Sequence, residues 1–170
     1  MNFIIFILLD DVVNLYYTYV VNLKEVEMTI KQTLESRMSY RIKRGKAFVY
    51  VPGDFTDLSD SDQIGRVFRS LVQAGLLVKI GQGIYARAKI SSLTGQPVPE
   101  KSLRDLAIEA LSKLGVEVAP SRYELAYNSG QTTQVPTGRV IGVKGRISRK
   151  ISYNGRSITF EKAAEQRRNH

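Results

Sequence analysis

The clearest periodic pattern of hydrophobic and polar positions lies between residues 59 and 75. Apolar residues recur there at a spacing of three and four, which predicts a helix with one buried face. They are Ile64, Val67, Phe68 and Leu71. Ser59 and Asp60 form an N-terminal capping signal, with Gln63 three residues after Asp60, and Gly75 is where the helix is expected to end.

Two β-prone runs follow this helix, at residues 77–80 and 84–88, and they flank Gly81-Gln82-Gly83. This pattern predicts a hairpin. A helix with a basic outer face before a glycine-tipped hairpin is typical of a winged helix-turn-helix, in which the helix enters the major groove of DNA. The predicted DNA-binding residues are Gln63, Arg66, Arg69, Ser70 and Gln73 on the helix and Lys79, Arg87 and Lys89 on the hairpin. An ordinary solvated basic face is the alternative interpretation.

The segment before the long helix fits the same fold. A capping box begins at Thr29, and apolar residues every four positions predict a helix that ends near Gly45. They are Ile30, Leu34, Met38 and Ile42. A short strand at residues 48–51 and a short helix at residues 55–58, capped by Asp54, complete the order expected of a winged helix. Residues 28–90 are therefore predicted to be a winged helix-turn-helix domain, with Phe48, Phe55, Leu58 and Phe68 in its core.

The second half of the chain predicts a small α+β domain with an antiparallel sheet. Residues 91–101 contain Ser, Thr, Gly and two prolines and are expected to be a linker. The predicted elements are a helix at 102–114, a brief strand at 116–118, a short helix from Ser121 to Tyr127, a polar loop at 128–138, a strand at 139–143 and two strands at 147–153 and 156–160. Asn154-Gly155 between the last two is the strongest local hairpin signal in the chain. The predicted domain covers residues 102–163, and residues 164–170 are a tail.

The charge is uneven along the chain. Its net value is +9, and residues 1–27 hold one lysine and four acidic residues, so these carry −3 and the remainder carries +12. Such an excess favours a polyanionic partner, usually nucleic acid, although it can also serve solubility alone. The second domain contributes a predicted basic surface at Arg139, Arg146, Arg149, Lys150 and Arg156. We expect this surface to meet either DNA beside the operator or an acidic partner protein.

Residues 1–27 have an unusual composition. Their apolar runs lack the preceding basic residues of a signal peptide, and Asp10 and Asp11 interrupt what would be a membrane-spanning helix. Phe, Ile, Asn, Tyr and Leu are frequent, as in the translation of an A/T-rich promoter. The hypothesis is that this extension is not native sequence and that Met28 is the true start.

Candidate catalytic residues are scarce. The chain has no cysteine, which fits a reducing cytoplasm, and its one histidine is the terminal His170. It contains no phosphate-binding glycine motif. The acidic group Asp54, Asp57, Asp60 and Asp62 could suggest a magnesium-dependent nuclease, but these residues are better explained as helix caps and first-turn acids. We therefore expect no enzymatic activity, no cofactor and no metal site.

Three sequence features together resemble a known family. They are Gly53-Asp54-Phe55, Gly83-Ile84-Tyr85, and Ala126-Tyr127-Asn128 leading to Thr133-Gln134-Val135-Pro136. In this order, from Met28 to about Ala163, they resemble an uncharacterised bacterial family related to the AbiEi antitoxins of type IV toxin–antitoxin systems. Relatives more often carry a basic residue where this chain has Ser70, and they continue beyond the point where it ends, so the second domain is expected to be truncated.

The resemblance implies a DNA-binding unit with a second domain, an antitoxin or repressor role and no enzymatic activity. We expect a cytoplasmic, antitoxin-like regulator that binds double-stranded DNA and represses its own operon, with a toxin encoded nearby as a further partner. Neither a small-molecule substrate nor a membrane is expected. Two alternatives remain: a module whose second domain neutralises a toxin while DNA binding is secondary, and a metal-dependent nuclease.

Overall fold

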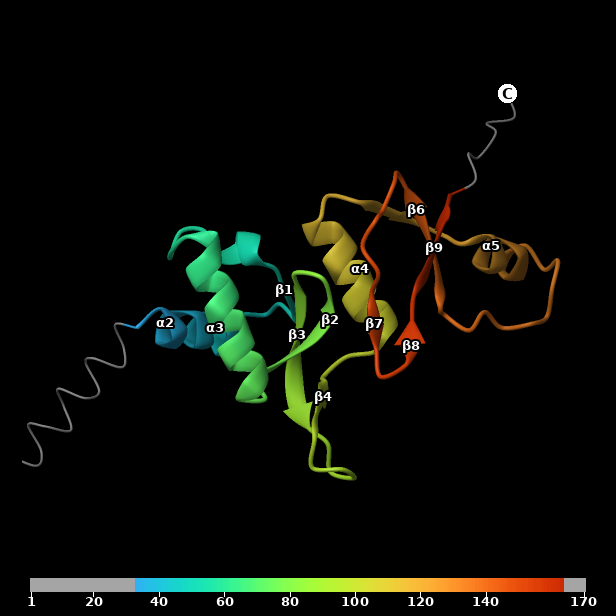
Figure 1. Ribbon diagram of the computed structural model, residues 1–170. Helices are drawn as coiled ribbons and strands as arrows, with labels where there is room; N and C mark the ends of the chain where they lie inside the picture. Colours follow the sequence, from blue (N-terminus) through green and yellow to red (C-terminus); the bar gives the residue numbers. More distant parts are fainter. Residues whose placement is uncertain (1–32, 164–170) are drawn as a thin grey trace, which may run out of the picture. The chain divides into compact units, whose positions relative to one another are not determined.

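The computed structural model describes residues 33–163 (Figure 1). The predictions for residues 1–27, for the capping box at Thr29 and for the tail lie outside the described residues. The chain divides into two compact units, residues 1–43 and 44–170, which are treated separately below. In the first unit, α2 (Leu34–Arg44) begins where the Thr33 hydroxyl accepts a hydrogen bond from the Ser36 N–H. Met38 and Ile42 of the predicted apolar stripe are buried.

The second unit combines helices and short strands, so the predicted α+β class is confirmed. Its elements in chain order are β1 (Val49–Tyr50), the 3-10 helix η1 (Pro52–Phe55), α3 (Ser61–Gln73), β2 (Leu77–Gly81), β3 (Ile84–Ile90), β4 (Pro97–Pro99), α4 (Leu103–Lys113), β5 (Glu117–Ala119), α5 (Arg122–Asn128), β6 (Val140–Lys144), β7 (Ser152–Tyr153), β8 (Arg156–Ser157) and β9 (Thr159–Lys162).

The strands form two sheets and a separate hairpin. The first sheet has the order β1-β3-β2, with β4 also paired to β3; the second has the order β5-β6-β9; β7 and β8 form the hairpin. All pairs are antiparallel except β6–β9, which is parallel, whereas the sequence predicted an antiparallel sheet here. A parallel pair needs a long connection between its strands, and residues 145–158, which include the β7–β8 hairpin, provide it.

Helix α3 covers one face of the first sheet. The rings of Phe68 on α3 and Tyr85 on β3 stack with centroids 4.2 Å apart, and Phe55 meets Phe68 edge-on at 5.6 Å. Ile64 and Leu71 complete the buried face of α3. Phe55 and Phe68 therefore pack in the core as predicted, in contacts worth about 0.5–1.5 kcal/mol each beyond their buried area. Phe48 and Leu58, which were predicted for the same core, are only partly buried.

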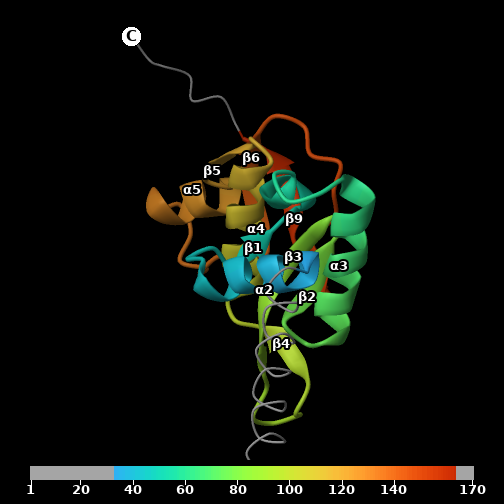
Figure 2. The same ribbon diagram turned by 90° about the vertical axis from the view of Figure 1, so that its left-hand side faces the viewer.

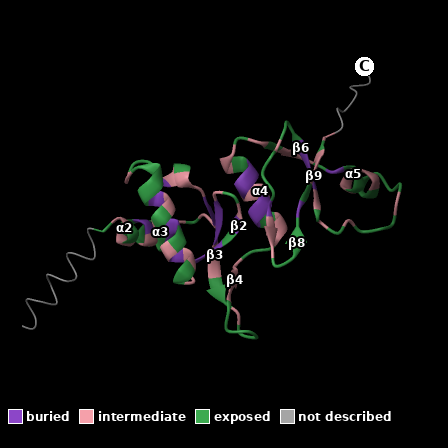
Figure 3. Ribbon diagram, viewed as in Figure 1, coloured by how far each residue is buried: buried purple, intermediate pink, exposed green. Residues whose placement is uncertain are grey.

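Helix α4 covers the opposite face of the same sheet (Figure 2). One cluster of buried residues joins β1, β2 and β3 to α4 and to the second sheet (Figure 3). It consists of Val49, Val78, Ile80, Ile84, Ala86, Leu106, Ala107, Ala110, Leu111, Ile141, Val143, Ile151 and Ile158. The residues before and after the predicted linker at 91–101 therefore share one hydrophobic core.

Part of the predicted linker forms a strand. Residues 97–99 form β4, which pairs with the end of β3, with Lys89 opposite Val98. Its two prolines lack a backbone donor, which an edge strand tolerates because one side of it faces solvent. Tyr153 of β7 reaches the same strand, and its hydroxyl donates to the carbonyl of Pro97 at 2.9 Å.

Two polar side chains of α4 bind the segment that contains β1 and η1. Glu109 Oε1 accepts hydrogen bonds from the backbone N–H groups of Phe48 and Val49, at 2.8 and 2.9 Å. Val49 begins β1, an edge strand of the sheet, and Phe48 directly precedes it. Lys113 Nζ lies 2.6 Å from Asp54 Oδ2. The helix therefore supplies hydrogen-bond partners that the edge strand otherwise lacks.

Local capping and turn signals were mostly predicted well. Asp60 accepts from the N–H groups of Asp62 and Gln63, and α3 ends before Gly75, whose φ is 72°. The short helix predicted at 55–58 instead lies at 52–55, because Pro52 presets the first helical turn. Asp54 closes this turn by accepting from the Val51 N–H at 2.9 Å.

The predicted Asn154-Gly155 hairpin is present between β7 and β8. Both turn residues have positive φ, 46° and 74°, as a two-residue type I′ turn requires. The paired strands are shorter than predicted, because the chain leaves the hairpin after Ser157 to form β9.

Candidate nucleic-acid interface

The outer face of α3 carries the predicted contact residues. Gln63, Arg66, Arg69 and Gln73 are exposed, and Ser70 is half-buried. The face follows from the helical period: the apolar residues of α3 are held against the sheet, so the intervening polar positions point to solvent. These side chains are available to a partner without any rearrangement of the core.

A shallow hollow of about 660 Å³ separates α3 from the strands beside it. Arg66, Arg69 and Gln73 line it from the helix, Lys79 lines it from β2, and Tyr85 lines it from β3. Lys79 on β2 stands directly opposite Tyr85 on β3, so their side chains lie on the same face of the sheet. This is the face that α3 covers, because Tyr85 stacks on Phe68 of α3. The hollow therefore brings together three of the predicted cations from two different elements.

Gly65 also lines the hollow, in the interior of α3. A Cβ atom built on it would meet no heavy atom within 4 Å, so packing does not demand glycine there. Glycine in a helix interior is less favourable than alanine by about 0.8–1.0 kcal/mol. The absence of a side chain leaves the backbone of α3 open to a close approach from outside.

Arg87 departs from its predicted role as a phosphate contact. Its guanidinium Nη2 donates to the carbonyl of Gly45 at 2.7 Å and to the hydroxyl of Tyr50 at 2.9 Å. The guanidinium also lies 5.4 Å from the ring centroid of Phe48. Arg87 stands opposite Leu77 on β3, the strand between β1 and β2. Its guanidinium therefore binds groups within the protein and does not point to solvent.

Lys89 is exposed but lies outside the hollow. It sits on the part of β3 that pairs with β4, four residues beyond Tyr85. At 3.3 Å per residue this places it about 13 Å along the strand from the hollow. Lys89 and the α3 residues therefore do not form one compact group.

The cations near the hollow differ from several others in the chain, which are paired with carboxylates. Ion pairs join Arg104 to Glu124, Lys113 to Asp54, Arg122 to Glu161, and Lys144 to Glu117. Within residues 33–163 no carboxylate forms an ion pair with Arg66, Arg69 or Lys79. These three cations therefore form no ion pair among the described residues, although Asp62 also lines the hollow, so the hollow carries a net positive charge.

The predicted second basic surface is split. Arg146, Arg149 and Lys150 are exposed in the segment between β6 and β7, whereas Arg139 precedes the other end of β6. Arg156 lies on β8, opposite Tyr153 in the hairpin. The structure brings the first three together and separates Arg139 from them by the length of a strand.

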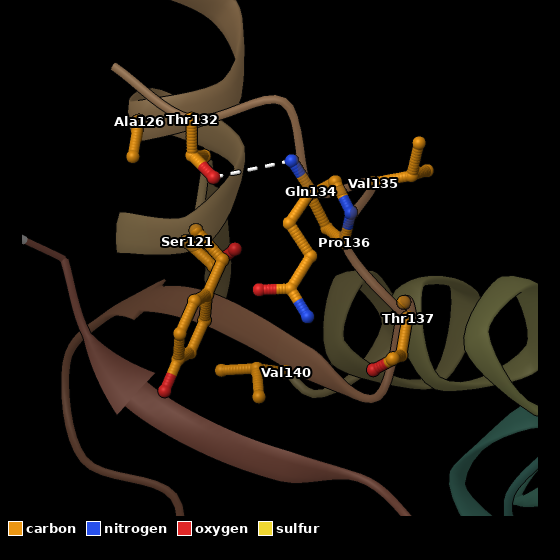
Figure 4. Close-up of a pocket in the computed structure, with 10 residues that line it drawn as sticks. Ser121, Ala126, Thr132, Gln134, Val135, Pro136, Thr137 and Val140 are labelled. Atoms are coloured by element: carbon orange, nitrogen blue, oxygen red, sulfur yellow. Dashed lines mark hydrogen bonds between the residues drawn. The ribbon is translucent and has the colours of Figure 1, made fainter.

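A second hollow, of about 480 Å³, lies under the polar loop that contains Thr133-Gln134-Val135-Pro136. The side-chain amide of Gln134 points into the space between Ser121, Thr137 and Val140, and its backbone N–H donates to the Thr132 hydroxyl (Figure 4). Tyr123 and Val135 are large apolar residues that are substantially exposed here. This lining suits a partner whose surface is largely uncharged and carries a few hydrogen-bonding groups.

Glu124 and Arg104 hold this loop in place, and sequence reasoning did not single out either residue. Arg104 Nη1 donates to the carbonyls of Gly138 and Val140, and Nη2 pairs with Glu124. Burial of Glu124 works to raise its pKa, but hydrogen bonds from the Ser121 backbone and hydroxyl and the charge of Arg104 outweigh it, so the pKa lies below its ordinary value. The spacing Ser121-x-x-Glu124 is a capping box that could have identified Glu124.

The acidic residues considered for a metal site have other roles. Asp54 pairs with Lys113, and Asp60 caps α3. Among the described residues, no three side chains of His, Cys, Asp or Glu gather closely enough to hold a metal ion. A search of the same residues for a helix long and apolar enough to span a membrane found none.

Comparison with known protein families matches residues 36–168 to DUF6088, a family of unknown function. The chain belongs to this family. No curated protein and no solved structure matches the chain. Membership in DUF6088 brings no activity or ligand with it, so any function for the chain has to be argued from the geometry of the site.

Proposed function

We propose that this protein is a DNA-binding, antitoxin-like transcriptional regulator that represses its own operon in the cytoplasm. The proposal combines the resemblance to the AbiEi-related antitoxins with the arrangement of α3 and the sheet. The order β1, η1, α3, β2, β3 and the pairing of β1 with β3 fit a winged helix-turn-helix, in which a helix enters the major groove and a hairpin contacts the backbone.

The observation that carries the proposal is the hollow between α3 and β2. Arg66 and Arg69 on the helix lie across an open surface from Lys79 on the strand, and none of the three forms an ion pair within residues 33–163. They outnumber Asp62, the one acidic residue in the lining of the hollow. Unpaired cations that surround a concave surface attract a polyanion strongly, because the low-dielectric walls focus the field. Double-stranded DNA provides one negative charge per about 1.7 Å of its axis.

The contact residues divide into two roles. Gln63, Arg66, Arg69 and Gln73 project from the exposed face of α3, where side chains of a groove-bound helix reach base edges. Lys79 lies on the strand and is assigned to a phosphate. Arg87 is left out of the proposed interface because its guanidinium is already bound to Gly45 and Tyr50.

Fluorescence anisotropy with the DNA upstream of the protein's own gene and with a scrambled duplex tests the proposal. Arg66→Ala should weaken binding to the upstream DNA and reduce the preference over the scrambled duplex, because a bidentate arginine–guanine contact is worth about 1–3 kcal/mol. Lys79→Ala should weaken binding to both duplexes alike and reduce the salt slope by about 0.9, since one phosphate contact is lost.

Arg139→Ala is the matched control for both variants. It removes one positive charge from an exposed position at the far end of β6, where the first sheet and α3 are not involved. Its affinity, sequence preference and salt slope should stay close to those of the unaltered protein. If Arg139→Ala lowers affinity as much as Arg66→Ala does, binding follows net charge alone and the proposed interface is wrong.

A second candidate function is the neutralisation of a toxin by the second half of the chain. It is favoured by the hollow under the loop at residues 131–138, where Tyr123 and Val135 expose apolar surface. Exposed apolar groups rimmed by polar ones are common at protein interfaces. If this function holds, Val135→Asp should abolish co-purification with the product of the adjacent gene while leaving binding to the upstream DNA unchanged.

A further inference from the structure

The segment between β6 and β7 lies against the turn of the β2–β3 hairpin. Its three basic residues, Arg146, Arg149 and Lys150, are all exposed. The residue that follows them, Ile151, is fully buried and forms an antiparallel bridge with Gly81 at the end of β2. The exposed cations are therefore held by a fixed anchor, beside a strand that is distant in the sequence (Figure 1).

Gly81 and Gly83 of the β2–β3 hairpin lie very close to the segment between β6 and β7. A Cβ atom on Gly81 would lie 2.8 Å from the carbonyl oxygen of Lys150, a distance that side chains do not tolerate. A Cβ atom on Gly83 would lie 3.8 Å from the guanidinium Nη1 of Arg149. The guanidinium of Arg149 is thus located at the hairpin turn itself.

The hairpin turn lacks charge of its own. Its tip is Gln82-Gly83, so a wing with this sequence has no cation to offer a phosphate. Arg149 brings a positive charge to the turn from another part of the chain, and the backbone of the exposed Lys150 lies beside it. Within residues 33–163 neither of them forms an ion pair with a carboxylate.

These positions make the basic surface continuous with the hollow beside α3. Lys79, which lines that hollow, is two residues before Gly81 on β2. Arg149 is therefore separated from Lys79 by two residues along β2 and by one strand-to-strand spacing, a distance of about 10 Å. One strand of a duplex presents about three phosphates over that length, so Lys79 and Arg149 can contact the same backbone tract.

We propose that residues 146–150 are a second DNA-contact segment, which grips the phosphate backbone beside the β2–β3 turn in place of a charged wing tip. This inference rests on the proposed function. It assigns Arg149 and Lys150 to phosphates and gives them no part in reading bases. DNA is preferred over an acidic protein as the partner because the segment adjoins the strand that carries Lys79.

The first experiment measures the salt dependence of DNA binding by the full chain. The double variant Arg149→Ala/Lys150→Ala should bind the upstream duplex with a salt slope lower by about 1.8, corresponding to two lost phosphate contacts, and with an unchanged preference over the scrambled duplex. The control Arg122→Ala/Arg139→Ala removes the same charge from α5 and from the start of β6. Its slope should stay within about 0.5 of that of the unaltered protein.

The second experiment measures proximity without removing any charge. The chain has no cysteine, so Ser148→Cys provides a single attachment point for an iron chelate that cleaves DNA within its reach. Ser148 is exposed and lies within the proposed segment; Ser112→Cys, on the exposed side of α4, is the control. We expect backbone cleavage from position 148 at one edge of the protected site and only background cleavage from position 112.

The outcomes separate this inference from the proposed function. If Arg66→Ala weakens binding while the Arg149/Lys150 variant keeps the full salt slope and position 148 cleaves at background level, the second segment is wrong and the function stands. If the unaltered protein binds no duplex more tightly than heparin, both fail. If the Arg149/Lys150 variant keeps its DNA binding but loses an acidic protein partner, the segment is a protein contact and the inference is overturned.

Discussion

Replacing Glu109 with alanine should show that residues 44–163 depend on one shared core. Glu109 Oε1 accepts from the N–H groups of both Phe48 and Val49. Each hydrogen bond to a charged acceptor contributes about 1.5–3 kcal/mol, and partial access of water to the vacated site reduces the sum. We expect the free energy of unfolding to fall by about 2–4 kcal/mol, a large part of the stability of a domain this size.

Urea denaturation followed by circular dichroism measures this loss. With a slope of about 2 kcal/mol per molar urea, the midpoint should move down by about 1–2 M, in a single transition. Glu109→Gln keeps one acceptor oxygen and should lose about 1 kcal/mol. Glu117→Ala is the control, because Glu117 pairs with Lys144 at an exposed position, where an ion pair contributes about 0–1 kcal/mol.

Two results would refute this reasoning. A loss for Glu109→Ala no larger than for Glu117→Ala would mean that α4 does not complete the edge of β1. Separate transitions for the two halves of the unaltered protein would mean that the core at Val78 and Leu106 is not continuous. A single transition for every variant is the expected outcome.

Three further predictions concern the second half of the chain. The lowered pKa of Glu124 gives a stabilisation that is present above its ordinary value of 4.5 and is lost as the pH falls through the folded-state pKa; urea unfolding between pH 3 and 6 should show this loss, and Glu124→Gln should flatten it. Asn154→Ala should lower the free energy of unfolding by about 1–2 kcal/mol, because φ is 46°, and a thermal melt that finds Asn154→Gly equally damaging would contradict this cause. Gly142→Ala should lower it by about 1–3 kcal/mol, because its Cβ atom would lie 2.6 Å from the Pro120 carbonyl oxygen; an unchanged melting temperature would contradict the close approach.

The features predicted correctly from sequence are those that depend on neighbours along the chain. Capping by Asp60, the end of α3 at Gly75 and the Asn154-Gly155 turn each follow from the backbone preferences of a few consecutive residues. The buried face of α3 follows from helical periodicity. None of these signals depends on which element packs against which.

The features that sequence could not predict are contacts between distant segments. The Pro97–Pro99 strand looked like a linker, because its pairing with β3 leaves no pattern in its own residues. Arg87 looked like an exposed cation, since alternation along β3 does not reveal that Gly45 and Tyr50 cover it. The bridge between Gly81 and Ile151, which joins the two predicted basic surfaces, spans 70 residues and has no local signal.

Gly65→Ala provides the most direct test of the claim that the open face of α3 approaches DNA. The substitution adds one methyl group in the hollow without removing any charge, and two quantities are measured on the same variant: the free energy of unfolding and the affinity for the upstream duplex. The account predicts that they move in opposite directions. Stability rises by about 0.8–1.0 kcal/mol, because alanine is the better helix residue, while affinity falls several-fold. A variant that is stabilised and binds the duplex with unchanged affinity would contradict the proposed interface.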